Sequence, residues 1–95
     1  MNEQEKIARI CKILSVATRV RMLDLLKRRT LCVNALSRIL RITPAAVSQH
    51  LRILRDAHIV KAEKKGYYVH YTINNTTLAD WCRKSQRLLE PGHKD

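Results

Sequence analysis

The sequence is poor in aromatic, glycine and proline residues. Its 95 residues include no phenylalanine, one tryptophan, three tyrosines, two glycines and two prolines. Apolar residues still make up 45% of the chain, which is enough for a folded protein and excludes a disordered one. We therefore expect a single domain over residues 1–95, with a core built mainly from Leu, Ile, Val and Ala side chains.

Acidic residues are also scarce, and this leaves a large positive charge. Eight Asp and Glu against nineteen Lys and Arg give a formal net charge of +11. The stretch from Lys27 to Lys65 holds ten basic residues against only Asp56 and Glu63. Because such an imbalance concerns partners rather than fold, we expect this stretch to face a polyanion, a generally basic surface being the alternative.

Paired cysteines, long apolar runs and catalytic motifs are missing as well. Cys11, Cys32 and Cys82 form no C-x-x-C spacing, and no run approaches the roughly 18 apolar residues of a membrane span. The N-terminus lacks the apolar core of a signal peptide. The four histidines and three cysteines show no spacing that would pair a nucleophile with a base, and no glycine-rich phosphate loop is present. We expect a cytoplasmic protein with reduced thiols, no membrane partner and no enzymatic activity.

Apolar residues at helical spacing predict four helices before residue 58. Thr18 is the expected N-cap of the second helix. Thr43, followed by Pro44 at the first helical position, strongly predicts the start of the fourth. The expected helices span residues 3–16, 19–28, 33–40 and 44–57.

Beyond Ala57 the apolar period changes from helical to alternating. Residues 59–63 and 67–73 are predicted strands around a basic tip, Lys64-Lys65-Gly66. A last helix is expected over 77–89, with Thr77 and Asp80 as a capping box. The order of four helices, a hairpin and a helix predicts a mainly α fold with a β-hairpin wing, the winged helix-turn-helix.

The fourth predicted helix has the composition of a DNA-recognition helix. Its first turns carry small or polar side chains, which allow close approach to base edges. Gln49 can bond adenine, alanine methyls can contact thymine, and Arg52 can reach a guanine or a phosphate. For Ser48 and His50 a structural role is the alternative. Predicted contacts in this helix and its cap are Thr43, Ala45, Ala46, Ser48, Gln49, His50 and Arg52.

Four cations outside this helix are candidate backbone contacts. Arg38 and Arg41 precede the helix, and Lys64 and Lys65 lie at the wing, where a solvated turn is the alternative. Contacts to phosphates position a protein on DNA without specifying sequence. One domain contacts too few base pairs for strong selectivity, so we expect a homodimer on an inverted repeat of double-stranded DNA. The broad apolar faces of the first and last helices are the expected dimer surface, although they can instead complete a monomer core.

Four segments resemble the ArsR/SmtB family of metalloregulators, in the family order. They are Ala17–Leu23, Leu31–Leu36, Thr43–Arg55 and Gly66–Tyr71, and the resemblance that they mark extends over nearly the whole chain. The resemblance implies a winged helix-turn-helix homodimer that pairs through its first and last helices. It also implies a sequence-specific repressor that leaves its operator when a metal or metalloid binds.

The family's metal sites are matched in part. Cys32 is kept, whereas Asn34 stands where the family has a second thiolate. Asp80 and Cys82 hold two positions of the family's last-helix site, and His93 falls near a third. No cofactor is required, and zinc, cadmium or arsenite is the inducer that the resemblance implies, with Cys32, Asp80, Cys82 and His93 as candidate ligands. A thiol-redox-responsive regulator, an inducer-independent one and a non-specific architectural DNA-binding protein are the alternatives.

Overall fold

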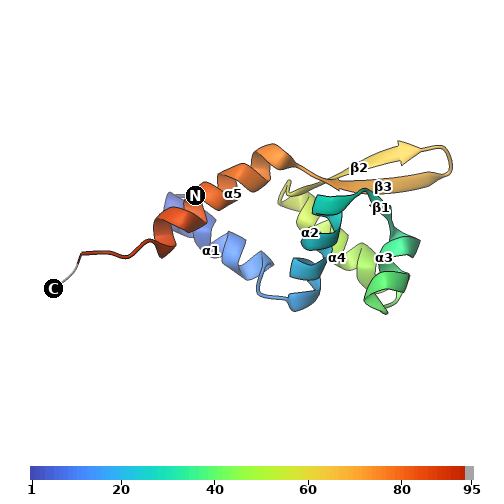
Figure 1. Ribbon diagram of the computed structural model, residues 1–95, viewed down its shortest axis with the longest axis horizontal. Helices are drawn as coiled ribbons and strands as arrows, with labels where there is room; N and C mark the ends of the chain where they lie inside the picture. The colour runs from blue at the N-terminus through green and yellow to red at the C-terminus, as the bar shows by residue number, and fades with distance from the viewer. Residues whose placement is uncertain (94–95) are drawn as a thin grey trace.

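Five helices and a small antiparallel sheet make up the part of the chain that the structure, a computed structural model, describes: residues 1–93. Figure 1 shows the helices clustered beside a protruding hairpin. The predicted winged helix-turn-helix order is confirmed, with one extra strand. The elements are α1 (Glu3–Ile13), α2 (Ala17–Arg28), β1 (Leu31–Cys32), α3 (Val33–Leu40), α4 (Pro44–Asp56), β2 (Val60–Lys65), β3 (Tyr68–Ile73) and α5 (Asn75–Leu89).

Local sequence explains how α3 and α4 are joined. Arg41 takes the left-handed conformation, with φ of 57°, and so ends α3. Two residues later Thr43 Oγ1 accepts a hydrogen bond from the backbone N–H of Ala46 at 3.1 Å. Pro44 follows at the first helical position, where no N–H is needed. The predicted span of the third helix and the predicted cap of the fourth are both confirmed.

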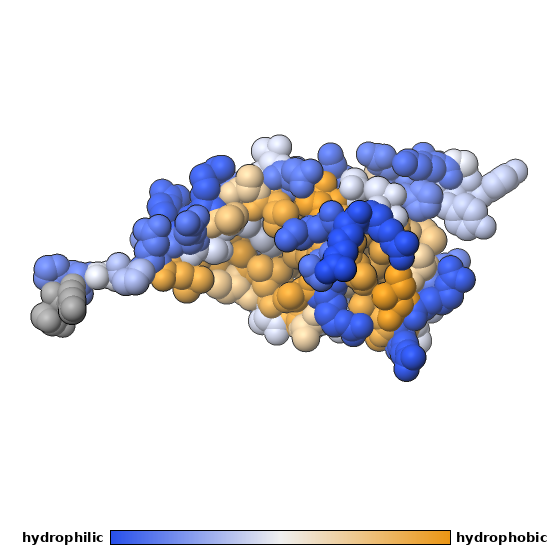
Figure 2. Space-filling view, in the orientation of Figure 1, coloured by the Kyte–Doolittle hydropathy of each residue, from blue (hydrophilic) through white to orange (hydrophobic). Residues whose placement is uncertain are grey.

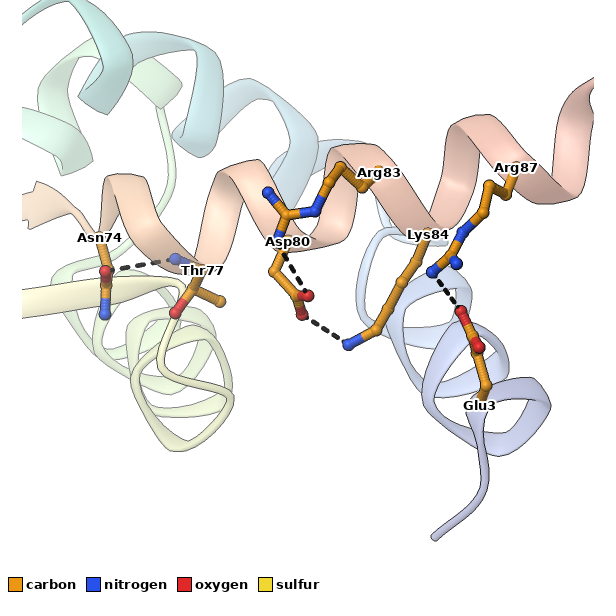
Figure 3. Close-up of polar contacts among 7 residues, drawn as sticks. All are labelled: Glu3, Asn74, Thr77, Asp80, Arg83, Lys84 and Arg87. Atoms are coloured by element: carbon orange, nitrogen blue, oxygen red, sulfur yellow. Dashed lines mark hydrogen bonds and ion pairs between the residues drawn. The ribbon is translucent and has the colours of Figure 1, made fainter.

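Two predicted caps are wrong. The second helix begins at Ala17 with Val16 at the N-cap and no side-chain hydrogen bond, so Thr18 lies inside its first turn. The last helix begins at Asn75, because the side chain of Asn74 accepts from the backbone N–H of Thr77 (Figure 3). The capping box expected of Thr77 and Asp80 is therefore absent. A helix can be capped by any of several nearby polar residues, and here the one closer to the strand does so.

The first helix is shorter than predicted, ending at Ile13 rather than residue 16. The hairpin also differs, since β2 continues through Lys65 and the turn falls on Gly66 and Tyr67. Lys65 pairs with Tyr68 across the ladder. Gly66 has φ of 64°, a conformation that glycine adopts without steric cost. The two wing lysines thus lie at the end of a strand and not in the turn.

The short strand β1 was not predicted. Leu31 lies opposite Tyr71 and Cys32 opposite His70, so β3 is the central strand of a sheet ordered β1-β3-β2. A two-residue strand shows no periodicity, and only its partner defines it. This pairing attaches the start of α3 to the wing.

One hydrophobic cluster includes side chains from all five helices and from β2 and β3. Val47, Leu51 and Leu54 place the inner face of α4 in it, each at most 1% exposed, as the helical pattern predicted. Ile10 and Trp81 extend the cluster between α1 and α5, which lie side by side at one end of an elongated molecule of 57 × 24 × 24 Å (Figure 1). Among the described residues no helix is long and apolar enough to cross a membrane.

Candidate nucleic-acid interface

The outer face of α4 is free of intramolecular packing. Its buried stripe faces the core, and the residues between the stripe positions therefore reach solvent. Ala46 and His50 are half-buried at the edges of the exposed face. The predicted contacts that are exposed on or next to α4 are Thr43, Ala45, Ser48, Gln49 and Arg52.

The start of α4 is suited to a phosphate as well as to base edges. The helix dipole makes a helix N-terminus attractive to anions, although Pro44 has no N–H and the N–H of Ala46 is already bonded to Thr43. Thr43 uses its oxygen to accept from Ala46, which leaves its O–H able to donate to a phosphate. The small side chains of Ala45 and Ser48 allow close approach of this end to a partner.

His50 is directed partly inward from the same helix. Its Nδ1 atom is buried and has no hydrogen-bond partner. Burial lowers the pKa of His50, and the positive charge of Arg19 lowers it further. The buried Nδ1 atom therefore forms no core hydrogen bond, and a contact of His50 with a phosphate stays a prediction.

The cations beside α4 form no ion pair with any acid among residues 1–93. Every ion pair within residues 1–93 uses Asp24, Asp80 or Glu3 as its acid. The five cations predicted to face DNA take part in none of these pairs, and all five side chains are exposed. Their charge is therefore available to an external anion. They are Arg38, Arg41, Arg52, Lys64 and Lys65.

A groove of about 700 Å³ joins the helix-turn-helix to the wing. It runs between the starts of α3 and α4 on one side and β3 on the other. Sequence reasoning missed Asn34 and Tyr68 as members of this surface, although the neighbouring wing lysines pointed to the region. Tyr68 is 59% exposed, and His70 has a buried Nδ1 atom without a hydrogen-bond partner. The lining residues are Cys32, Asn34, Ser37, Arg38, Pro44, Tyr68 and His70.

The predicted metal ligands are not brought together in one subunit. Cys32 belongs to β1 beside the wing, whereas Asp80 and Cys82 lie on α5 (Figure 1). Asp80 binds Lys84 at 2.6 Å and Arg83 at 3.5 Å (Figure 3). These cations, with the hydrogen bond from Lys84 as the largest contribution, hold the pKa of the Asp80 carboxyl below its ordinary value. Residues 1–93 contain no group of three or more His, Cys, Asp or Glu side chains arranged to hold a metal.

The paired helices α1 and α5 carry exposed apolar and thiol side chains. Arg87 of α5 binds Glu3 of α1 at 2.5 Å (Figure 3). Leu88 and Leu89 are 57% and 77% exposed. Cys11 and Cys82 are exposed free thiols.

Figure 2 shows apolar side chains at the surface in the middle of the molecule, while hydrophilic ones gather over the hairpin.

Three relatives match most of this chain. The "Transcriptional repressor SdpR" of Bacillus subtilis is 29% identical over 86 residues, covering 90% of this chain and 96% of that protein. The "Uncharacterized HTH-type transcriptional regulator MJ1325" of Methanocaldococcus jannaschii is 38% identical, covering 77% and 83%. The "Cadmium resistance transcriptional regulatory protein CadC homolog" of Staphylococcus aureus is 34% identical, covering 83% and 66%.

Solved structures and a family model agree with these relatives. A "Possible transcriptional regulator for arsenical resistance" has a TM-score of 0.78 at 28% identity, covering 84% of this chain and 83% of its own. Reduced HlyU from Vibrio cholerae has a TM-score of 0.74 at 28% identity, covering 93% of each chain. The model described as "Bacterial regulatory protein, arsR family" matches residues 17–62, which run from α2 into the wing. This chain therefore belongs to the arsR family of bacterial regulatory proteins, whose winged helix-turn-helix members are DNA-binding transcriptional repressors.

Proposed function

We propose that this protein represses transcription as a homodimer bound to an inverted-repeat operator, and that it catalyses no reaction. One domain spanning residues 1–95 supplies each half of the dimer. In each half α4 enters the major groove and the wing lies against the neighbouring backbone. The observation that carries this proposal is the exposed face of α4 with Gln49 and Arg52, flanked by cations that have no acidic partner within residues 1–93. Because its partner is DNA, we place the protein in the cytoplasm.

The side chains of α4 divide between reading bases and holding the backbone. Gln49 donates to and accepts from an adenine edge, and the methyl group of Ala45 contacts a thymine methyl. Arg52 binds a guanine or a phosphate. Thr43 donates to a phosphate at the helix start. Lys64 and Lys65 at the end of β2 neutralise phosphates, so binding weakens as salt concentration rises.

Dimer formation is supported by the exposed side of the α1–α5 pair. Leu88 and Leu89 have little cover within the subunit, and α5 ends directly after them. Burying this apolar surface against a second copy would stabilise both subunits. Two α4 helices related by a two-fold axis read two half-sites about one helical turn apart, which multiplies selectivity.

A metal inducer is not required by this proposal. Names of relatives and neighbours refer to cadmium and to arsenical resistance, which supports cadmium or arsenite as an inducer, whereas zinc rests on the family resemblance alone. The donor groups of this chain do not fit such a role within one subunit, since Asp80 is bound by two cations and Cys32 lies on a different element. Soft metals bind best to several thiolates, and no two cysteines lie on the same element.

Selection of preferred duplexes from a random pool, followed by competition in fluorescence anisotropy, tests the proposal. A selected inverted repeat should bind at least about 10³-fold more tightly than its scrambled form at physiological salt. Comparable affinity for both sequences would instead identify a non-specific architectural protein. Sedimentation of the complex should give two chains per duplex.

Two variants separate base reading from phosphate binding. Gln49→Ala should weaken the selected duplex about 10-fold to 100-fold and relax the preference at one base pair. Gln86→Ala, an exposed glutamine on α5, is the matched control and should change neither. Lys65→Gln should weaken all duplexes alike and lower the slope of log affinity against log salt by about one per subunit.

A further inference from the structure

A second cavity lies away from the DNA-facing surface, where the first half of α1, the middle of α5 and the end of α4 meet. Its volume is about 350 Å³, within the range of roughly 300–1,000 Å³ that small-molecule sites occupy. Three structural elements surround it, and none of its residues belongs to the proposed DNA contacts. The lining residues are Met1, Lys6, Arg9, Ile10, Ala57, Trp81 and Lys84.

The inner wall of this cavity is apolar and belongs to the core. Ile10 is 5% exposed, and Ala57 and Trp81 are each 9% exposed. The indole of Trp81 offers a large rigid face against which an aliphatic chain or an aromatic ring can pack. A ligand that fills the cavity therefore gains from an apolar body.

The remaining wall is positively charged. Lys6 and Arg9 lie one turn apart on α1, and neither side chain has an ion-pair or hydrogen-bond partner within residues 1–93. Lys84, whose side chain is only 17% exposed, binds Asp80 at 2.6 Å (Figure 3). Asp80 is thereby already paired with its own partners, and Lys6 adds a further attraction to it, so this one carboxylate faces several cations. The charge at this wall favours an anionic head group.

We propose that this cavity binds a small organic carboxylate with an apolar body of about a dozen non-hydrogen atoms, and that the ligand acts as an effector of DNA binding. The carboxylate contacts Lys6 and Arg9 while the body packs on Trp81 and Ile10. Ala57 is the C-cap of α4, so the ligand touches the recognition helix and both helices of the proposed dimer surface. The effector role, unlike ligand binding itself, rests on the proposed function.

The emission of Trp81 reports on binding directly, because it is the only tryptophan in the chain. Titration of the intact protein with decanoate should change this emission saturably. The uncharged 1-decanol should bind about tenfold more weakly, since it lacks the charge that Lys6 and Arg9 recognise. No saturable change, or equal affinity for the alcohol, would overturn the binding site.

Matched double variants locate the site. Lys6→Gln with Arg9→Gln should weaken decanoate about tenfold. Lys12→Gln with Arg21→Gln removes the same charge from exposed positions on α1 and α2 outside the cavity and should leave the affinity unchanged. Equal weakening by both pairs would show that decanoate responds only to net charge. Thermal unfolding followed by circular dichroism verifies that each variant is folded.

Anisotropy of the selected duplex, with and without saturating decanoate, tests the effector role. Coupling between two sites typically changes affinity by about 5-fold to 150-fold. Because decanoate only stands in for the natural ligand, we expect a smaller change in duplex affinity, of about threefold or more. Unchanged affinity would overturn the effector role and leave the binding site standing. A protein that binds no duplex at all would overturn the proposed function and the effector role together, while the Trp81 titration still decides the binding site.

Discussion

The guanidinium of Arg19 closes the end of α1, where its Nε donates to the carbonyl oxygen of Ile13 at 2.6 Å and its Nη2 to that of Lys12 at 3.5 Å. The last carbonyls of a helix have no partner within the helix, and a cation at this end also complements the helix dipole. Arg19 is 9% exposed and is the one charged residue that is buried within residues 1–93. It thus joins α1, which belongs to the proposed dimer surface, to α2 of the helix-turn-helix.

Replacing this arginine should destabilise the fold. Arg19→Met keeps an apolar stem but removes the donor to the buried carbonyl of Ile13, while the Lys12 carbonyl keeps its hydrogen bonds from Ser15. We therefore expect a loss of about 1–3 kcal/mol in the free energy of unfolding. Urea unfolding followed by Trp81 fluorescence measures it. Arg21→Met, an exposed position on the same helix, should stay within about 0.5 kcal/mol of the original protein. Equal effects of the two substitutions would refute a specific role for Arg19.

The N-cap of α4 should contribute to stability independently of DNA. Thr43→Ala removes the oxygen that accepts from Ala46, and we expect a loss of about 1 kcal/mol in the free energy of unfolding. Thr43→Ser keeps the hydroxyl and should retain most of the stability. Thr76→Ala, at an exposed position in the first turn of α5, controls for helix propensity. Chemical denaturation of the three variants measures these differences. If Thr43→Ala were as stable as Thr43→Ser, the N-cap hydrogen bond would contribute no stability.

Stability should fall in mild acid because of His50. Burial and Arg19 lower the pKa of His50 in the folded protein, while the unfolded chain takes up the proton near the usual value of about 6.5. The stability that neutral His50 contributes to the folded protein is therefore fully present above about pH 6.5. It is lost as the pH falls toward the pKa of His50 in the folded protein. The measurement is urea unfolding between pH 7.5 and 5.5. His50→Gln should flatten this dependence, and an equally steep loss of stability in that variant would contradict the assignment to His50.

At Gly66 in the turn of the wing there is room for a side chain, but the backbone conformation disfavours any residue other than glycine. A Cβ added at Gly66 would meet no atom within 4 Å, yet φ there is +64°. Gly66→Ala should therefore cost about 1 kcal/mol in the free energy of unfolding, and Gly66→Asn should cost less because asparagine tolerates this conformation. Gly92→Ala, where φ is not in the left-handed region and space is open, is the control and should be neutral. A thermal melt that ranks Gly66→Asn below Gly66→Ala would contradict this account.

Much of the DNA-facing surface could be predicted from local sequence. Thr43 and Pro44 mark a helix start through interactions within four residues, and the spacing of Val47, Leu51 and Leu54 shows which face is buried. The exposed positions of Gln49 and Arg52 follow directly from that spacing. In contrast, Asn34 and Tyr68 could not be assigned to this surface, since it is the pairing of β1 with β3 that brings them to one groove.

By itself, the sequence determined the number and order of the five helices, the hairpin, the buried stripe of α4 and the basic character of the DNA-facing side, because each depends on the period and composition of a short segment. Tertiary structure alone decided how the two ends of the chain meet, since Arg87 of α5 binds Glu3 of α1. The junction of α1 and α2 is local by comparison, because Arg19 supplies the missing donor only six residues after Ile13. Two further details are local although the pattern did not predict them: Lys84 binds Asp80 four residues earlier, and Asn74 caps α5 by accepting from Thr77 three residues later. Only packing of α1, α4 and α5 creates the cavity beside Trp81, because residues from the two ends of the chain must meet before it exists.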